Sequence, residues 1–298
     1  MTKKTALGFI GLGMMGKYMA KNLLKNHYQV IGYNRSKKVL RELKKSGLVV
    51  ATTPAQVGEQ SEIIILMLPS AKETKEVIFG QNGLSQGLSR GQIVIDMSTS
   101  NPDDTIKIKR RLKTKGVQML DAPVSRGQRA AVNATLSIMV GGDKKTFTKC
   151  LPVFKALGNF IVHLGPFGSG LYVKALNNFL FALNLMASTQ GLMIIKKNKI
   201  NLRKSIEVIS ESSGHNRAMA ISINRNLGLK RPSIGFYLRH MAKDVNIFSQ
   251  VARNQKVKNS LAKPVLAFYQ AMAKKYGQAD TMYVFEHLLV KNQKLPKK

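Results

Sequence analysis

Lys174, Asn177 and Asn178 are the residues whose types and spacing could carry chemistry most directly. They occupy positions i, i+3 and i+4 of a long helix-like run and therefore share one helical face. A lysine held among apolar neighbours has a lowered pKa and can exchange a proton near neutral pH. Lys174 is therefore a candidate for proton exchange. The alternative is a surface lysine on a helix that joins two domains.

A second candidate site is a glycine-rich turn that follows a short apolar run and opens a helix. Its sequence is Gly11-Leu12-Gly13-Met14-Met15-Gly16. In this pattern the first glycine permits a tight turn, the second lets the backbone approach a pyrophosphate, and the third lets helix and strand pack closely. The exposed amides at the helix start then bind phosphate. The turn predicts a dinucleotide cofactor, and the alternative is an ordinary glycine turn between strand and helix.

The next strand-like run ends in Asn34-Arg35-Ser36. Enzymes that use NAD usually place an acidic residue here, on the 2′-hydroxyl of the ribose. Asn34 carries no such charge, while Arg35 can pair with a 2′-phosphate and Ser36 can donate a hydrogen bond. We therefore expect a preference for NADP(H), with NAD(H) as the other possibility; Arg35 could instead stack beside adenine or face solvent.

The elements that must position these residues alternate along the first half of the chain. Short apolar or β-branched runs read as strands, and polar amphipathic runs between them read as helices. The strands are expected at 7–10, 29–33, 62–67, 93–96, 117–120 and 136–140, with helices from 16 to about 25, at 36–46 and from about 102 to 115. The pattern predicts an α/β fold with a Rossmann-type, doubly wound parallel sheet.

After about Pro166 the strand patterns disappear. A helix-like run without proline covers 171–196, and further helical segments follow at 203–210, 236–251 and 261–276. We therefore expect two domains, a dinucleotide-binding domain over 1–166 and an all-helical domain over 167–298, joined by the long helix.

Three motifs, in order and spacing, carry a family resemblance over nearly the whole chain. They are the N-terminal Gly-Phe-Ile-Gly-Leu-Gly-Met-Met-Gly, the segment from Asp121 to Gly142 that contains Asp-Ala-Pro-Val-Ser-Arg-Gly, and the segment from Gly168 to Asn178. Together they resemble the beta-hydroxyacid dehydrogenase family, which includes 3-hydroxyisobutyrate dehydrogenases and tartronate semialdehyde reductases.

The resemblance implies a role for several residues. The lysine that matches Lys174 serves the substrate oxygen as acid or base, and the asparagine that matches Asn178 orients the substrate. Ser125 and Gly127 match a cradle for the substrate carboxylate. The expected reaction transfers a hydride between a nicotinamide cofactor and a small anionic 3-hydroxy acid or its semialdehyde, with the protein supplying position and the proton.

Arg126 departs from the family pattern, which has glycine between the residues that match Ser125 and Gly127. The arginine could occlude the cradle, clamp a substrate anion through two hydrogen bonds, or point to solvent. A Pro-Val-x-Arg pattern is similar to the sulfolactaldehyde reductase branch, where this arginine receives a sulfonate. The departure leaves the substrate open and the chemistry unchanged.

The resemblance also extends to residues on the nicotinamide half of the cofactor. Leu68 and Thr99 follow two of the expected strands, and Lys243 begins a Lys-Asp pair whose lysine reaches the cofactor in the family. The alternatives are a core position for Leu68 and a solvated helix charge for Lys243.

The composition argues against several other classes of protein. The net charge is +33, but it is spread along the chain without a nucleic-acid-binding motif, so solvated lysine-rich faces explain it better than a nucleic-acid surface. Cys150 is the single cysteine, which excludes an internal disulfide, and no apolar run suggests a membrane span. No spacing of His and Cys suggests a metal site. We expect a cytoplasmic enzyme that forms a homodimer or homotetramer.

The sequence is also compatible with two other functions. The charge would suit a catalytically silent relative that associates with nucleic acid, but retention of Lys174 and Asn178 argues against it. An imine reductase would share the architecture and prefer NADPH, but such enzymes lack a lysine at the position of Lys174.

Overall fold

The computed structural model describes residues 5–223, 235–283 and 288–289. The chain divides into two compact units, Met1–Lys174 and Ala175–Lys298. This division lies inside the long helix α9 (Ser169–Lys197), whereas the sequence places the boundary at 166/167, just before the helix begins. The two boundaries differ by residues 167–174, and within this segment the amides of Gly168 and Leu171 donate to Asp121 in the first unit.

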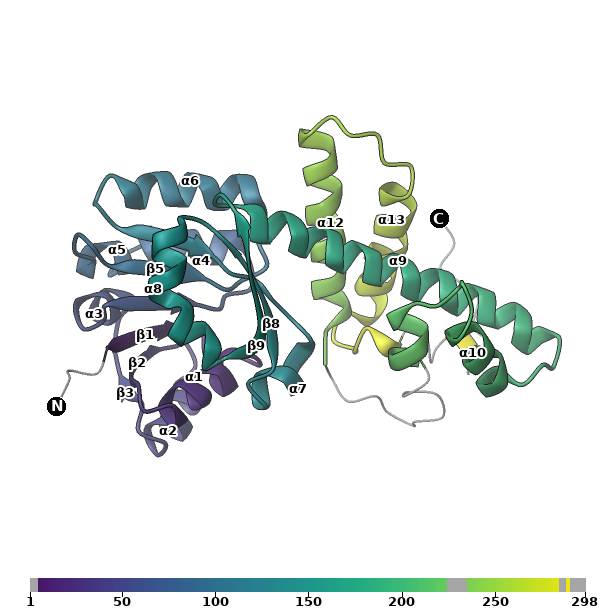
Figure 1. The fold of residues 1–298 in the computed structure, drawn as a ribbon, viewed down its shortest axis with the longest axis horizontal. Helices are drawn as coiled ribbons and strands as arrows, with labels where there is room; N and C mark the ends of the chain where they lie inside the picture. Colours follow the sequence, from purple (N-terminus) through teal and green to yellow (C-terminus); the bar gives the residue numbers. More distant parts are fainter. Residues whose placement is uncertain (1–4, 224–234, 284–287, 290–298) are drawn as a thin grey trace. The chain divides into compact units, whose positions relative to one another are not determined.

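The first unit is built on a nine-stranded sheet in the order β3-β2-β1-β4-β5-β6-β8-β7, with β9 pairing to β8 (Figure 1). The six strands from β3 to β6 run parallel in the order 3-2-1-4-5-6, which is the order of the Rossmann fold. The strands are β1 (Ala6–Ile10), β2 (Gln29–Tyr33), β3 (Val49–Val50), β4 (Ile63–Leu66), β5 (Ile93–Asp96), β6 (Gln118–Asp121), β7 (Val124–Ser125), β8 (Leu136–Gly141) and β9 (Gly158–Gly165).

The far end of the sheet corrects one expectation, because the sheet is mixed and not parallel throughout. β8 runs antiparallel to both β6 and β7, and β9 runs parallel to β8. The connection from β7 to β8 covers only residues 126–135, which is shorter than the dozen or more residues that a parallel crossover requires. The Rossmann-type fold class is confirmed, with this antiparallel extension.

Helices cover both faces of the sheet. On one face, apolar residues of α1, α2, α7 and α8 pack with Phe9, Ile65 and Ile95, and on the other, α3 to α6 pack with Ile64 and Val94. The helices are α1 (Gly16–Lys25), α2 (Lys37–Lys44), α3 (Pro54–Glu59), α4 (Ala71–Phe79), α5 (Leu84–Gly87), α6 (Pro102–Lys113), α7 (Gly127–Val132) and α8 (Lys144–Lys155). Cys150 of α8 is buried in the first of these layers, and burial raises the pKa of its thiol to about 12.

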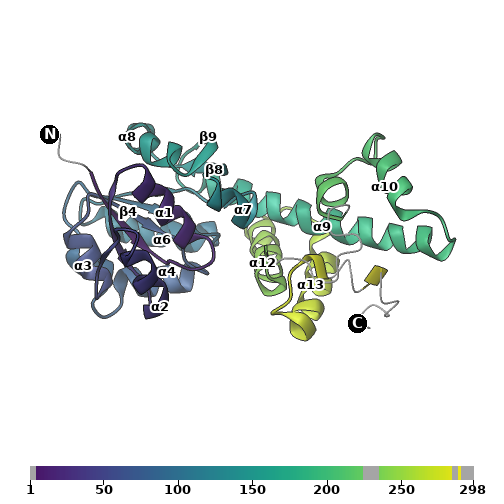
Figure 2. The ribbon, with the colours of Figure 1, turned by 90° about the horizontal axis from the view of Figure 1, so that it is seen from below.

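The second unit is helical over the residues that the structure describes, apart from an isolated bridge between Tyr237 and Asp280. After α9 come α10 (Leu202–Ser210), a π-helix (Ala218–Ile223), α12 (Leu238–Asn254) and α13 (Ala262–Tyr276). Phe179 and Ala182 of α9 pack with residues of α12 and α13, and the buried Tyr269 hydroxyl donates to the Ala182 carbonyl oxygen at 3.0 Å. Figure 2 shows α9 as one unbroken helix.

α9 is long and apolar enough to cross a membrane by length and composition alone. The same composition is typical of a helix in the core of a globular unit. Phe179, Ala182 and Leu185 of α9 are almost completely buried against other helices of the second unit, and Asn178 beside them is buried as well. These contacts favour a core helix.

Candidate active site

The glycine turn between β1 and α1 has the geometry that the motif requires. Gly11 has φ +99°, and a Cβ there would lie 2.2 Å from the Met67 carbonyl oxygen. A Cβ on Gly16 would lie 2.0 Å from the Gly11 carbonyl oxygen, so the start of α1 packs directly on the turn. A Cβ on Gly13 would meet nothing within 4 Å. The open space at Gly13 fits the approach of a pyrophosphate to the backbone.

The start of α1 is suited to bind an anion. Its N-cap, Met15, makes no side-chain capping bond, and its first turn contains no acidic residue. The other residues of the turn differ in exposure, since Leu12 is buried while Met14 is partly exposed. A helix N-terminus without its own acidic side chain favours a bound phosphate through its amides and its dipole.

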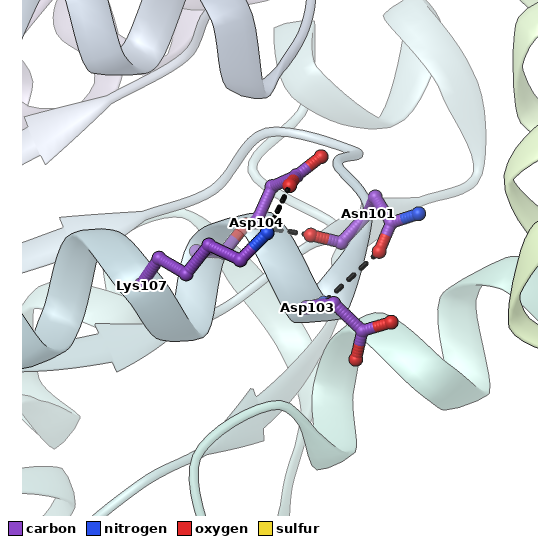
Figure 3. Close-up of polar contacts among 5 residues, drawn as sticks. Asn101, Asp103, Asp104 and Lys107 are labelled. Carbon is purple, nitrogen blue, oxygen red and sulfur yellow. Dashed lines mark hydrogen bonds and ion pairs between the residues drawn. The ribbon is translucent and has the colours of Figure 1, made fainter. Parts of the chain in front are cut away.

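The start of α6 shows the opposite arrangement (Figure 3). Asn101 caps this helix by accepting a bond from the Asp103 amide at 3.0 Å, and Asp104 pairs with Lys107 at 3.3 Å. The first turn of α6 therefore contains both a cap and acidic groups. Among the two helix starts that follow core strands β1 and β5, the charge distribution favours an anion at α1.

Asn34 at the end of β2 is tied to the glycine turn. Its Oδ1 atom accepts a bond from the Leu12 amide at 3.0 Å, and its Nδ2 atom donates to the Ser36 carbonyl oxygen at 3.3 Å. The side chain that stands where an acidic residue would be expected thus holds the turn in place. Arg35 and Ser36 are exposed beside it.

The ends of β4 and β5 are joined by side-chain bonds. The Leu68 amide donates to Ser98 Oγ at 2.9 Å, and the Ser98 amide donates to Asp96 Oδ1 at 3.0 Å. Ser98 and Asp96 are fully buried, while Leu68 and Thr99 are partly exposed. The sequence prediction for Leu68 and Thr99 did not include Ser98 and Asp96, which fix the loops on which they lie.

Ser125, Arg126 and Gly127 form the turn from β7 into α7. Arg126 and Gly127 both have positive φ, +81° and +68°, a conformation that favours glycine and is strained for arginine. Arg126 Nη1 donates to the Thr135 carbonyl oxygen at 3.2 Å and to Asn159 Oδ1 at 2.8 Å. The guanidinium is therefore anchored towards β8 and β9 although the residue is exposed, a contact that the sequence did not predict.

Lys174 lies in the second turn of α9 and is only 7 % exposed. The turn before it is held by Asp121, a buried residue at the end of β6. Asp121 Oδ1 accepts from the Gly168 amide at 2.6 Å, and Oδ2 accepts from the Leu171 amide at 3.0 Å. Burial raises the pKa of the Asp121 carboxyl to about 6, against the opposing effect of these amide bonds. Asp96 lies directly beside Asp121 in the sheet register and adds to the rise.

Asn178 is fixed by its neighbours in the second unit. Its Nδ2 atom donates to Asp244 Oδ2 at 2.5 Å, and its Oδ1 atom accepts from Asn177 Nδ2 at 3.0 Å. Asp244 is buried and its Oδ1 atom lies 2.9 Å from Lys243 Nζ. The structure thus connects two predicted site residues, Asn178 and Lys243, through Asp244. The Lys-Asp pair in the sequence marked Asp244, but its bond to Asn178, 66 residues away, was not predictable.

A metal site is not formed by the residues that the structure describes. No group of three or more His, Cys, Asp or Glu side chains lies close enough together in 5–223, 235–283 and 288–289 to hold an ion. His163 Nε2 is instead 2.8 Å from the Gly142 carbonyl oxygen, where it tethers β9.

Comparison with known proteins places this geometry in a family. Residues 6–165 match the model of the NAD binding domain of 6-phosphogluconate dehydrogenase, and residues 168–288 match that of the NAD-binding domain of NADP-dependent 3-hydroxyisobutyrate dehydrogenase. The chain is 32% identical to mitochondrial 3-hydroxyisobutyrate dehydrogenase of Mus musculus, over 97% of this chain and 88% of that protein. It is 31% identical to 3-sulfolactaldehyde reductase of Escherichia coli K12, over 96% of both chains.

Solved structures agree on the fold. The structure of 3-hydroxyisobutyrate dehydrogenase from Mycobacterium tuberculosis with L-serine superposes with a TM-score of 0.87, at 24% identity, over 96% of this chain and 99% of that one. The family models that match residues 6–165 and 168–288 and the relatives that align over nearly the whole chain therefore support the same family. The chain belongs to the beta-hydroxyacid dehydrogenase family and is an NAD(P)-dependent oxidoreductase.

Proposed function

We propose that this protein transfers a hydride between NADP(H) and a small anionic 3-hydroxy acid or its semialdehyde, with Lys174 as the general acid/base. The observation that carries the proposal is the burial of Lys174 one helical turn before Asn178, whose amide is held by two hydrogen bonds. A buried lysine amine that lies one helical turn from an asparagine suits proton exchange with a bound oxygen. The substrates in the names of the relatives support the substrate class.

The protein's own residues then have separate tasks. The nicotinamide, when bound, supplies or receives the hydride. During reduction, Lys174 Nζ donates a proton to the substrate oxygen as negative charge develops on it, and during oxidation the neutral amine accepts the hydroxyl proton. Ser125 and Gly127 hold the substrate carboxylate, and Asn178 orients the substrate through its amide.

The preference for NADP(H) rests on the end of β2. Asn34 uses its carbonyl oxygen on the Leu12 amide and presents no negative charge to a 2′-phosphate. Arg35 and Ser36 are exposed next to it and are able to bind that phosphate. Leu68, Thr99 and Lys243 complete the proposed cofactor set.

The identity of the substrate rests on Arg126. Its guanidinium uses Nη1 for Thr135 and Asn159, but an arginine has five N–H donors in a planar fork. We infer that the remaining donors bind the second anionic group of a sulfonated or doubly charged substrate. The similarity to 3-sulfolactaldehyde reductase supports this choice.

We also propose a domain boundary at 166/167, a homodimer or homotetramer, and a cytoplasmic location. The last of these is supported by a single buried thiol, which suits a reducing compartment.

Replacing Lys174 tests the mechanism. Lys174→Ala should lower kcat by roughly 10²–10⁴, the usual contribution of general acid/base catalysis, while NADPH binds as before. The measurement is NADPH oxidation with a panel of short carboxylated, sulfonated and phosphorylated aldehydes, together with NADPH binding by fluorescence titration.

The matched control is Lys107→Ala, which removes an exposed lysine that pairs with Asp104 on the surface of α6. It should turn over like the unaltered enzyme. A Lys174→Ala enzyme with near-normal kcat on the best substrate would refute the role of Lys174.

A further inference from the structure

Asp121 is a buried carboxylate whose oxygens bind the start of a distant helix. It ends β6, is completely buried, and accepts bonds from the amides of Gly168 and Leu171, 47 and 50 residues further along the chain. Bonds from amides to a charged acceptor are shorter and stronger than neutral ones. The carboxylate thus provides, from another element, the capping group for the first turn of α9.

The surroundings are shaped for this carboxylate. A Cβ on Gly141 would lie 2.4 Å from Asp121 Oδ1, and a Cβ on Gly170 would lie 2.8 Å from Oδ2 and 2.2 Å from the Met139 carbonyl oxygen. Both positions are therefore restricted to glycine by the presence of the carboxylate and by the close approach of β8. The first turn of α9 therefore packs closely against Asp121 and β8.

Lys174 lies one turn beyond this contact. Side chains on a helix lean towards its N-terminus, so the Lys174 side chain covers the turn that contains Gly170 and Leu171. Any loosening of that turn would move the amine and open it to water. The small exposure of Lys174, 7 %, shows how closely the present arrangement encloses it.

We propose that Asp121 is a positioning residue that fixes the first turn of α9 and thereby the place and burial of Lys174. The proposal rests on the proposed function of Lys174 for its catalytic consequence, but not for its structural one. Asp121 acts through α9 and touches neither the substrate nor the cofactor in this scheme.

The test measures the reactivity of Lys174 towards an acylating anhydride in three variants of the full chain. Asp121→Ala removes both acceptors, Asp121→Asn keeps the volume and one acceptor, and Asp143→Ala removes the aspartate that caps α8 through Thr146. Acylation of Lys174 is quantified by peptide mass spectrometry relative to the exposed Lys107 in the same chain. Steady-state kinetics and NADPH binding are measured on the same preparations.

We expect Lys174 to be acylated roughly tenfold faster or more in Asp121→Ala, the size that loss of a charge-assisted bond gives to a local opening. The rate of Lys174 acylation in Asp121→Asn should lie between the rates in Asp121→Ala and in the unaltered enzyme. The rate in Asp143→Ala should equal that in the unaltered enzyme. NADPH binding should stay within about twofold, while kcat falls about tenfold or more with little change in KM, because the site is assembled but the proton donor is misplaced.

Unchanged Lys174 acylation in Asp121→Ala would overturn the proposal, as would an equal rise in Asp143→Ala. If Asp121→Ala does not fold, Asp121→Asn decides, since unchanged acylation and kcat in that variant would also overturn it. If the proposed function is wrong, Lys174→Ala will show full turnover. The acylation measurement still tests the structural role of Asp121 in that case.

Discussion

Arg35 is the residue that we propose to distinguish NADPH from NADH. Arg35→Ala should weaken NADPH binding by about 10- to 100-fold, because a charge-assisted bond to the 2′-phosphate is worth roughly 1.5–3 kcal/mol. NADH has no phosphate there and should lose little. Fluorescence titration with both cofactors measures the effect, and Arg41→Ala on the exposed side of α2 serves as the charge-matched control. Equal losses for both cofactors would contradict the preference.

Arg126 combines a strained backbone with an anchored side chain. Arg126→Gly should raise KM about tenfold for sulfonated or doubly charged aldehydes, through loss of a charge-assisted clamp, and should leave small monocarboxylated ones unchanged or improved. The melting temperature should not fall, because glycine relieves a left-handed conformation that costs an arginine about 1–2 kcal/mol. KM values across the panel and a thermal melt give both results. Arg129→Ala, on the same short helix, should change neither, and unaltered selectivity in Arg126→Gly would return that side chain to a structural role.

The candidate site residues were proposed from motifs that are local in the sequence. The glycine turn, Ser125-Arg126-Gly127 and Lys174 with Asn178 are each recognised within a few positions of one another. The contacts that hold them were not predictable, because Arg126 meets Asn159 across 33 residues and Asn178 meets Asp244 across 66. Such pairs form when whole helices and strands pack together, and a local sequence pattern does not predict that packing.

At the scale of elements, substitutions of two glycines in the turn between β1 and α1 should affect NADPH binding and protein stability differently. Gly13→Ala adds a methyl group to open space, so the melting temperature should stay unchanged while NADPH binding weakens about tenfold or more, because the methyl group takes the place of the pyrophosphate. Gly16→Ala forces α1 away from the Gly11 carbonyl oxygen and should cost roughly 1–3 kcal/mol of stability in addition. Thermal melts and NADPH titration of both variants check this. A destabilised Gly13→Ala, or a Gly16→Ala that melts normally, would contradict the packing described.

The sequence predicted elements best where a periodic pattern runs through the core. The bounds of β2 and β5 agree with the expected ranges 29–33 and 93–96, since most of their residues are apolar or β-branched. α8 was not predicted, because Pro152 lies inside it and a proline usually ends a helix. β9 was also not predicted, since most of it is only partly buried and its pattern does not alternate clearly.

At the scale of the whole molecule, the helical unit leaves apolar side chains exposed. Within it, Leu176, Leu180, Ile194, Ile200 and Val208 are between 44 and 65 % exposed. Exposed apolar surface of this kind is often covered by a second copy of the chain. We therefore expect a mass of at least twice 33.0 kDa by light scattering at micromolar concentration.

Varying the salt concentration provides a control for the light-scattering measurement. Copies with a net charge of +33 repel one another, so association should strengthen as salt screens the repulsion. A mass of one chain at both low and moderate salt would contradict the expected assembly.

The buried Cys150 has a practical consequence for spectroscopy. Reagents that label thiols attack the thiolate, which is scarce at pH 7 to 8 when the thiol has a pKa of about 12 and no access to solvent. Since the chain has no other cysteine, a fluorophore or spin label will attach only to cysteines that are introduced on the surface. Pairs of such labels, one in each compact unit, can report distances between the units with and without NADPH, using the natural background sequence.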